Sequence, residues 1–235
     1  MTLPPPPKPD QPRFVPIADH AVLVEFGETI SDAAHAAVLA LDQAIAAAPP
    51  VGLRETVPAY VNLLVDFDPC QTDHAEIIAA LRRQIGPATA RRQSRQQHKV
   101  AVCYDPPFAP DLAQVAQHTG LSPEAVIAAH LSGRYHVVMY GFAPGYAYLA
   151  GLPPALRLDR KPTPVPNVPA GSVIIAGAQA LVTTLTMPTG WWIIGRSATP
   201  ILTGDPDRPF LFDVGDSVGF CRIGAGDMPG AAQNG

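Results

Sequence analysis

Several signals that would assign a function at once are missing from this chain of 235 residues. It has three cysteines and no CxxC pair, so neither a disulfide framework nor a cysteine metal site is predicted. Charged residues make up 15% of the chain and the formal net charge is -4. A strongly basic surface that would attract nucleic acids or anionic membranes is therefore excluded. No run of about 18 apolar residues occurs, so no membrane partner is expected.

Motifs of self-contained enzymes are missing as well. The sequence has no phosphate-binding GxxxxGK[ST] loop, no GxSxG and no histidine pair at metal-binding spacing. We therefore expect no cofactor and no metal in this chain, and no independent ATP-using hydrolase. The cysteines are widely spaced and the start lacks the pattern of a signal peptide, so a cytoplasmic location is expected.

The first part of the chain predicts a small α/β domain over residues 13–90. Residues 22–26 and 61–67 alternate between apolar and other side chains, as strands do. Ser31 and Asp73 each precede a helix-period apolar pattern, and such residues cap helix N-termini. Residues 1–12 contain four consecutive prolines and are expected to form a disordered tail.

A different pattern follows a polar segment, residues 91–97, which predicts a linker. Two short helices are expected at residues 111–119 and 122–131. Beyond them, short β-rich runs separated by Gly, Pro and Asp predict a closed antiparallel barrel, so that a second domain spans residues 98–223. The fold class is therefore α+β, and residues 224–235 are expected to form a disordered tail.

The helix pair also has the apolar spacing and glycine turn of a DNA-binding helix-turn-helix. A recognition helix needs basic or amide side chains, whereas Ser122–His130 offers Pro, Glu, Ala, Val and Ile. Together with the missing basic patch, this excludes nucleic acid as a partner.

Three motifs combine glycine or proline with aromatic or β-branched residues. They are GFAPGYAYL at Gly141–Leu149, VPAGS at Val168–Ser172 and GWWIIGR at Gly190–Arg196. Such compositions build tight loops that let a backbone approach a ligand or a partner closely.

In their order and content these motifs resemble the family of the 5-oxoprolinase B subunit, also called allophanate hydrolase subunit 1, which includes a sporulation-kinase inhibitor and carboxyltransferase subdomains C and D. GLP at Gly151–Pro153, AGxQ at Ala176–Gln179 and GD at Gly215–Asp216 extend the resemblance. It implies a cyclophilin-like barrel for the second domain. The fold name alone carries no implication of prolyl isomerase activity.

The resemblance also implies a function. The chain would be a non-autonomous subunit of an ATP-dependent amidohydrolase of the 5-oxoprolinase type, acting on a small lactam, amide or urea-like substrate. Its partners would be the C and A subunits of the same family system, and the assembled complex would use ATP. The alternative is a regulatory binding protein that resembles a histidine-kinase inhibitor.

Some motifs depart from the family pattern. The turn that usually reads AGRQTG is AGAQAL at residues 176–181, and the usual PR before VPAGS is Pro164-Val165. Polar groups that would face the pocket are lost while the scaffold is kept. This suits a relative with a less polar substrate, or one that has become a binding partner.

The resemblance and the loop chemistry together predict one concave substrate-binding surface at a barrel mouth. Its predicted residues are His130, Tyr135, Gly145, Tyr146, Gln179 and Arg196. Alternatives remain for several of them: His130 also fits a core histidine, and Arg196 also fits a structural salt bridge to Asp213 or Asp216. Arg160 and Lys161 are expected to be exposed.

Overall fold

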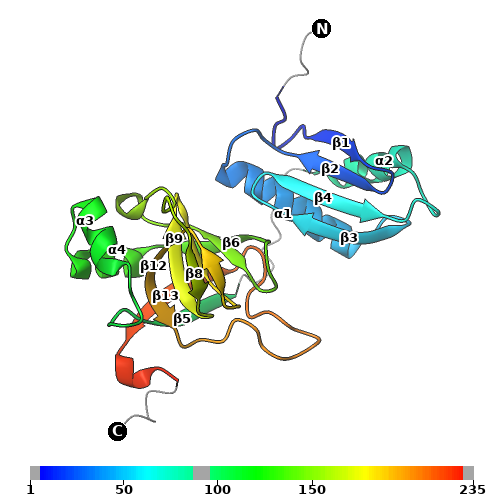
Figure 1. Ribbon diagram of the computed structural model, residues 1–235. Helices are drawn as coiled ribbons and strands as arrows, with labels where there is room; N and C mark the ends of the chain where they lie inside the picture. The colour runs from blue at the N-terminus through cyan, green and yellow to red at the C-terminus, as the bar shows by residue number, and fades with distance from the viewer. Residues whose placement is uncertain (1–5, 87–95, 230–235) are drawn as a thin grey trace. The chain divides into compact units, whose positions relative to one another are not determined.

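A four-stranded antiparallel sheet organises the first part of the chain in the computed structural model, which describes residues 6–86 and 96–229 (Figure 1). The chain divides into two units, Met1–Ser94 and Arg95–Gly235. In the first unit the strand order is β1 (Arg13–Ile17), β2 (Ala21–Glu25), β4 (Asn62–Phe67) and β3 (Leu53–Pro58). Helices α1 (Asp32–Ala47) and α2 (His74–Gln84) pack on one face of this sheet.

The two central strands supply the core of this unit. Val22 and Val24 on β2, and Leu63 and Val65 on β4, are fully buried against the helices, because alternate side chains of a strand point to the same face. The predicted caps are present: the hydroxyl of Ser31 accepts from the Ala34 N–H. Likewise, the carboxylate of Asp73 accepts from the Glu76 N–H.

The expected α/β pattern of two strands and two helices is incomplete, since β1 and β3 were not predicted. Each carries a proline, Pro16 or Pro58, and each is an edge strand. A proline has no N–H to donate to a neighbour, so it is tolerated at an edge and weakens the strand signal in a sequence. With all pairings antiparallel, the unit is α+β rather than α/β.

The second unit contains a closed barrel of strand order β10-β7-β6-β13-β5-β12-β9. Its strands are β5 (Gln97–Cys103), β6 (Tyr135–Tyr140), β7 (Ala147–Ala150), β9 (Ser172–Ala176), β10 (Gln179–Val182), β12 (Trp192–Ser197) and β13 (Ser217–Ile223). A two-stranded ribbon accompanies the barrel, formed by β8 (Val165–Val168) and β11 (Met187–Thr189). The α+β fold class with a barrel in the second half is thus confirmed.

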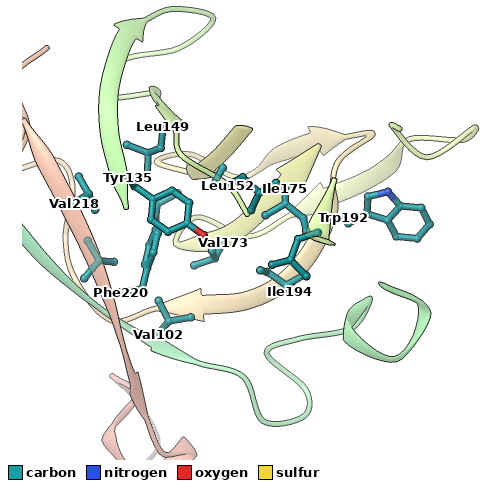
Figure 2. Close-up of a cluster of buried hydrophobic side chains, with 14 of the residues drawn as sticks. Val102, Tyr135, Leu149, Leu152, Val173, Ile175, Trp192, Ile194, Val218 and Phe220 are labelled. Carbon is teal, nitrogen blue, oxygen red and sulfur yellow. The ribbon is translucent and has the colours of Figure 1, made fainter. Parts of the chain in front are cut away.

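Alternate side chains of the barrel strands fill its interior. Figure 2 shows this core, with Tyr135 and Phe220 together and the indole of Trp192 well apart from them. Helices α3 (Leu112–Thr119) and α4 (Pro123–Ser132) pack on the same core and match the predicted pair closely. Ser122 caps α4 by accepting from the Ala125 N–H.

The barrel is closed by a parallel pair, which corrects the expectation of an antiparallel barrel. β5 and β13, the first and last strands of the unit, pair in parallel from Gln97↔Ser217 to Cys103↔Ile223. Parallel neighbours need a long connection, and here the whole of the intervening barrel provides it. The strand β5 itself was not predicted, because its polar start Gln97-His98-Lys99 hides the alternation of Val100 and Val102.

A buried hydrogen bond between His98 and Asp216 holds the beginning of both closing strands. His98 Nε2 lies 2.8 Å from Asp216 Oδ2, and the two side chains are 10% and 7% exposed. The same carboxylate accepts from the backbone N–H groups of Gln96 and Asp213, each at 2.9 Å. Asp216 therefore joins the loop before β13 to the start of β5.

The expected C-terminal tail needs a correction. Residues 225–227 form the short helix η2 (Ala225–Asp227), the Ala225 N–H donates to Asp105 Oδ2, and Met228 is buried, so this stretch is part of the folded unit. Residues 230–235 and 1–5 lie outside the described residues, as do residues 91–95 of the predicted linker. Gln97 of that linker begins β5 instead. The domain boundaries at 90 and 98 stay predictions.

Replacement of Asp216 tests the closing contact. Asp216→Ala is expected to lower the free energy of unfolding by about 3 kcal/mol or more, because it leaves two N–H groups and a buried imidazole without their acceptor. Urea denaturation at pH 7 measures the change. The matched control is Asp213→Ala, whose side chain is 75% exposed and lies 3.9 Å from Arg208, and which should cost less than about 0.5 kcal/mol. Equal effects of the two substitutions would contradict this account.

Candidate functional site

His130 lies in the core and does not line a surface. Its side chain is fully buried in the last turn of α4, with ring centres of Tyr135 and Phe220 at 5.4 and 4.4 Å. Tyr104 Oη lies 2.7 Å from Nδ1, and Tyr135 Oη donates to the His130 carbonyl oxygen. The alternative of a core histidine is therefore the one that the structure supports.

Burial keeps this aromatic group uncharged. It lowers the pKa of His130 to about 3 and raises the pKa of Tyr104. With the Tyr104 hydroxyl donating a hydrogen bond to Nδ1, the ring proton of the neutral imidazole lies on Nε2. That Nε2 has no hydrogen-bond partner among the residues the structure describes.

Gly145 is likewise buried, which corrects the expectation that its backbone is exposed to a ligand. It has φ +73°, and a Cβ at this position would lie 2.8 Å from Leu202 Cδ2 and 3.0 Å from Thr184 Cγ2. The glycine is thus required by a left-handed turn and by close packing against Leu202. It shapes the loop whose next residue, Tyr146, does face a cavity.

Tyr146 lines a cavity of about 280 Å³, which we call the aromatic cavity. Four aromatic and four aliphatic residues, with two polar side chains and one glycine, form its walls: Phe142, Tyr146, Tyr148, Trp191, Pro164, Ile174, Leu181, Pro188, Arg160, Thr189 and Gly190. None of these eleven is an acid, a histidine or a cysteine. The cavity is small and mainly apolar, as sites for small molecules commonly are.

The outer face of the barrel forms one wall of the aromatic cavity. Ile174 on β9 and Leu181 on β10 alternate with the interior residues of their strands, and they cluster with Trp191 and Tyr146. The hydroxyl of Tyr146 donates to the sulfur of Met187 on β11. Burial first, and then the neighbouring Tyr148, raise the pKa of Tyr146 to about 12, so this hydroxyl stays protonated near neutral pH.

Arg160 is the charged residue of the aromatic cavity. It is exposed, and its Cζ lies 5.8 Å from the centre of the Trp191 ring. No ion pair to Arg160 occurs within residues 6–86 and 96–229.

Lys161, the next residue, was expected to be exposed, but its side chain is largely buried. Its side chain is 8% exposed, and Nζ lies 2.6 Å from Asp111 Oδ2. Asp111 also accepts from the Ile193 N–H at 2.7 Å. Lys161 is therefore a structural residue that ties the 158–163 segment to α3 and β12.

A second cavity, of about 560 Å³, lies on the other side of this segment. Gln114 and His118 of α3, Trp192 and residues 158–163 form it. Trp191 and Trp192 are adjacent on the chain and thus face the two different cavities. Arg160 lines both.

Gln179 and Arg196 line neither cavity. Gln179 begins β10 opposite Ala150 and Ala176. The Cζ of Arg196 lies 5.5 Å from the Phe108 ring centre, and its Nε is buried without a hydrogen-bond partner among the described residues.

The alternative of an Arg196 salt bridge to Asp213 or Asp216 is wrong, because His98 pairs with Asp216 and Arg208 with Asp213. The structure therefore does not bring the six predicted residues to one mouth. His130 and Tyr135 are core residues, Gly145 is buried, and Tyr146 alone of the six lines the aromatic cavity. What each does in function stays a prediction.

The prediction missed Trp191, Phe142 and Arg160 as cavity residues. A usable signal was present: two adjacent tryptophans in one strand must point to opposite faces, so one of them had to leave the barrel interior. Phe142 is 75% exposed and has φ +75°, which is rare for a residue other than glycine.

Neither a metal site nor a membrane span occurs in the part of the chain that the structure describes. There, no group of three His, Cys, Asp or Glu side chains gathers where it could hold a metal ion. None of the helices in the same residues has the length and apolar character needed to cross a membrane.

Comparison with known proteins gives consistent matches. The family model "Carboxyltransferase domain, subdomain C and D" matches residues 12–212. The B subunit of 5-oxoprolinase from Bacillus subtilis (strain 168) is 34% identical over 222 residues, which cover 90% of this chain and 92% of that protein.

Solved structures agree. The crystal structure of TTHA0988 matches with 37% identity and a TM-score of 0.78, over 88% of this chain but 40% of that one, so this chain spans two fifths of its length. The urea carboxylase of Kluyveromyces lactis is 16% identical with a TM-score of 0.69, over 90% of this chain and 22% of that one, and shares the fold.

The burial of His130 predicts a pH dependence of stability. Its folded pKa of about 3 lies below the unfolded value of about 6.5, so between these values only the unfolded chain binds a proton there. Stability from this group is complete above pH 6.5 and falls on acidification. Between pH 7 and pH 5 the loss should be about 2 kcal/mol.

The free energy of unfolding of wild type, His130→Phe and His20→Gln, each measured at both pH values, tests this. Only His130→Phe should lose that part of the pH dependence; the exposed His20 serves as the control. In addition, NMR titration of the wild-type imidazole should show a pKa below 4. An imidazole that titrates near 6.5 in the folded protein would refute the assignment.

Two substitutions distinguish the contribution of Arg196 to stability from that of Lys161. Arg196→Ala is expected to lower the free energy of unfolding by about 1 kcal/mol or less, since it removes packing and a cation–π contact. Lys161→Ala should cost about 3 kcal/mol, because it leaves the buried Asp111 carboxylate without its cation. Thermal and urea unfolding of both variants measure the difference, and the reverse order of the two costs would contradict both roles.

Proposed function

This chain belongs to the family of the carboxyltransferase domain, subdomain C and D, and on that premise we propose that it is a non-autonomous subunit of a 5-oxoprolinase-type enzyme. The reaction is the ATP-dependent hydrolysis of a C–N bond in a small lactam, amide or urea-like substrate. The C and A subunits of the same family system complete the enzyme.

The subunit name of the Bacillus relative supports the dependence on partners. That relative matches this chain almost end to end, so the two are comparable over nearly their whole lengths. The aromatic cavity supports a small substrate, since about 280 Å³ accommodates a small ring.

The observation that carries the proposal is the chemistry of the cavity wall. Hydrolysis of an amide needs a group that accepts a proton and one that donates it. The eleven lining residues include no carboxylate, imidazole or thiol, and the raised pKa of Tyr146 keeps its hydroxyl protonated. The cavity therefore suits binding and orientation of a substrate, while a partner subunit supplies the reacting groups.

ATP belongs on a partner subunit in this proposal, because this sequence has no phosphate-binding glycine loop. The three cysteines are unpaired, which fits a reducing compartment, and we place the enzyme in the cytoplasm.

Reconstitution tests the proposal. The purified chain alone is expected neither to hydrolyse ATP nor to open 5-oxoproline, and both activities should appear together when proteins of the C and A subunit types are added. Coupled ATPase and glutamate-release assays measure this, with the partner mixture lacking this chain as the control. Turnover by the isolated chain would refute non-autonomy. A fully assembled complex without turnover of any lactam, amide or urea compound would refute the enzyme and favour the regulatory alternative.

A further inference from the structure

Four large hydrophobic side chains are exposed among the described residues of the second unit, and all four lie around the aromatic cavity or the loop at its edge. They are Phe142, Val165, Leu185 and Leu202, with exposed fractions of 75%, 37%, 41% and 37%, and we call them the apolar rim. From their arrangement we infer that the apolar rim is the docking surface for the partner subunit that supplies the reacting groups. The inference rests on the proposed function and specifies where that partner binds.

Two members of the apolar rim adjoin the cavity itself. Phe142 is one of its wall residues, and its ring centre lies 5.6 Å from that of Tyr146. Val165 on β8 pairs with Thr189 on β11, another wall residue. These two side chains are therefore exposed at the edge of the cavity.

The other two members lie against the loop that carries Phe142. A Cβ at Gly145 would be 2.8 Å from Leu202 Cδ2. The hydroxyl of Thr184, the residue before Leu185, donates to the Pro144 carbonyl oxygen at 2.6 Å. Single exposed apolar residues are common on a protein surface, but a group of them gathered at one place indicates an interaction site.

Hydrogen bonds within the loop fix the position of Phe142. The Gly141 N–H donates to the Tyr146 carbonyl oxygen at 3.2 Å, and the Tyr146 N–H donates to the Ala143 carbonyl oxygen at 3.1 Å. Phe142 has φ +75°, a conformation that costs free energy for a residue with a side chain. An exposed aromatic ring on such a fixed loop is typical of an interface anchor, because little conformational entropy is lost when a partner covers it.

The groups beside the apolar rim specify the chemistry of the partner. Pro164 and Pro188 are exposed wall residues without an N–H group to donate. Arg160 is the charged residue of the wall, and it has no ion pair within the described parts of the chain. The matching partner surface is therefore apolar and carries a carboxylate that meets Arg160.

The position of the apolar rim selects the occupant. A group that transfers a proton must come within hydrogen-bond reach of the substrate, and the cavity wall includes no carboxylate, imidazole or thiol. The subunit that supplies such groups must therefore cover the cavity, where it meets the apolar rim. A protein bound elsewhere on the second unit would leave the site incomplete.

Calorimetric titration in the absence of substrate tests the inference. The full chain, as wild type, Phe142→Ala or Phe142→Leu, would be titrated with the C-type and the A-type protein separately. We expect Phe142→Ala to weaken binding of the partner by about 10- to 100-fold, the usual effect of truncating an aromatic anchor. Phe142→Leu, which keeps an apolar side chain, should lie between. Arg160→Glu should also weaken binding, and more so at low salt, because it repels the partner's carboxylate.

The matched control is Ile30→Ala, a side chain of the first unit that is 69% exposed and not part of the apolar rim. It should bind the partner like wild type. Thermal unfolding checks that each variant folds: because Phe142 is exposed, Phe142→Ala should change Tm by no more than about 2 °C.

Equal affinity of wild type and Phe142→Ala for the partner would overturn the inference, and so would an equal loss in Ile30→Ala. Binding of a histidine-kinase domain, with no binding of either subunit, would also overturn it and support the regulatory alternative. Turnover is measured separately. An inactive complex whose assembly depends on Phe142 refutes the proposed function alone, and an active complex whose assembly does not depend on Phe142 refutes this inference alone.

Discussion

Closure of the barrel by its first and last strands is the constraint on which the second unit depends. Seven consecutive register pairs join β5 to β13, and the carboxylate of Asp216 connects the two strands where they begin. A closed barrel gives every strand one inner and one outer face. The outer face of β9, β10 and β12 then becomes available as the wall of a cavity, while the inner face is filled by apolar side chains.

The two adjacent tryptophans lie in different surroundings, because adjacent side chains of an extended chain point to opposite faces. Trp192 sits at the margin of the core (Figure 2) and lines the second cavity. Trp191 belongs to the outer cluster and lines the aromatic cavity. Between them runs the segment 158–163, held by hydrogen bonds to Gly190 and Trp192 and by the Lys161–Asp111 pair. Of the two adjacent cations in the segment, Lys161 is paired with Asp111, and Arg160 lies at the aromatic cavity near the Trp191 ring.

Local signals made part of this structure predictable. Ser31, Asp73 and Ser122 marked helix starts because a cap is an interaction within four residues of sequence. Strands β1, β3 and β5, which contain a proline or begin with polar residues, were not predicted, because pairing with neighbouring strands stabilises them and their own residues give little signal. The predicted site failed for a similar reason. Whether His130 is buried or Arg196 finds an acid depends on contacts with residues far along the chain, such as Phe220 and the His98–Asp216 pair.

The parallel closing pair also determines how the second unit responds to force. The chain enters the barrel at Gln97 and leaves it at Ile223, which lie at opposite ends of one strand pair. Tension applied through the two neighbouring segments would pull these strands past each other lengthwise, so all of their hydrogen bonds share the load and must break together. A hairpin pulled from its open end opens one bond at a time. This strand arrangement therefore resists mechanical extension of the barrel along its own chain.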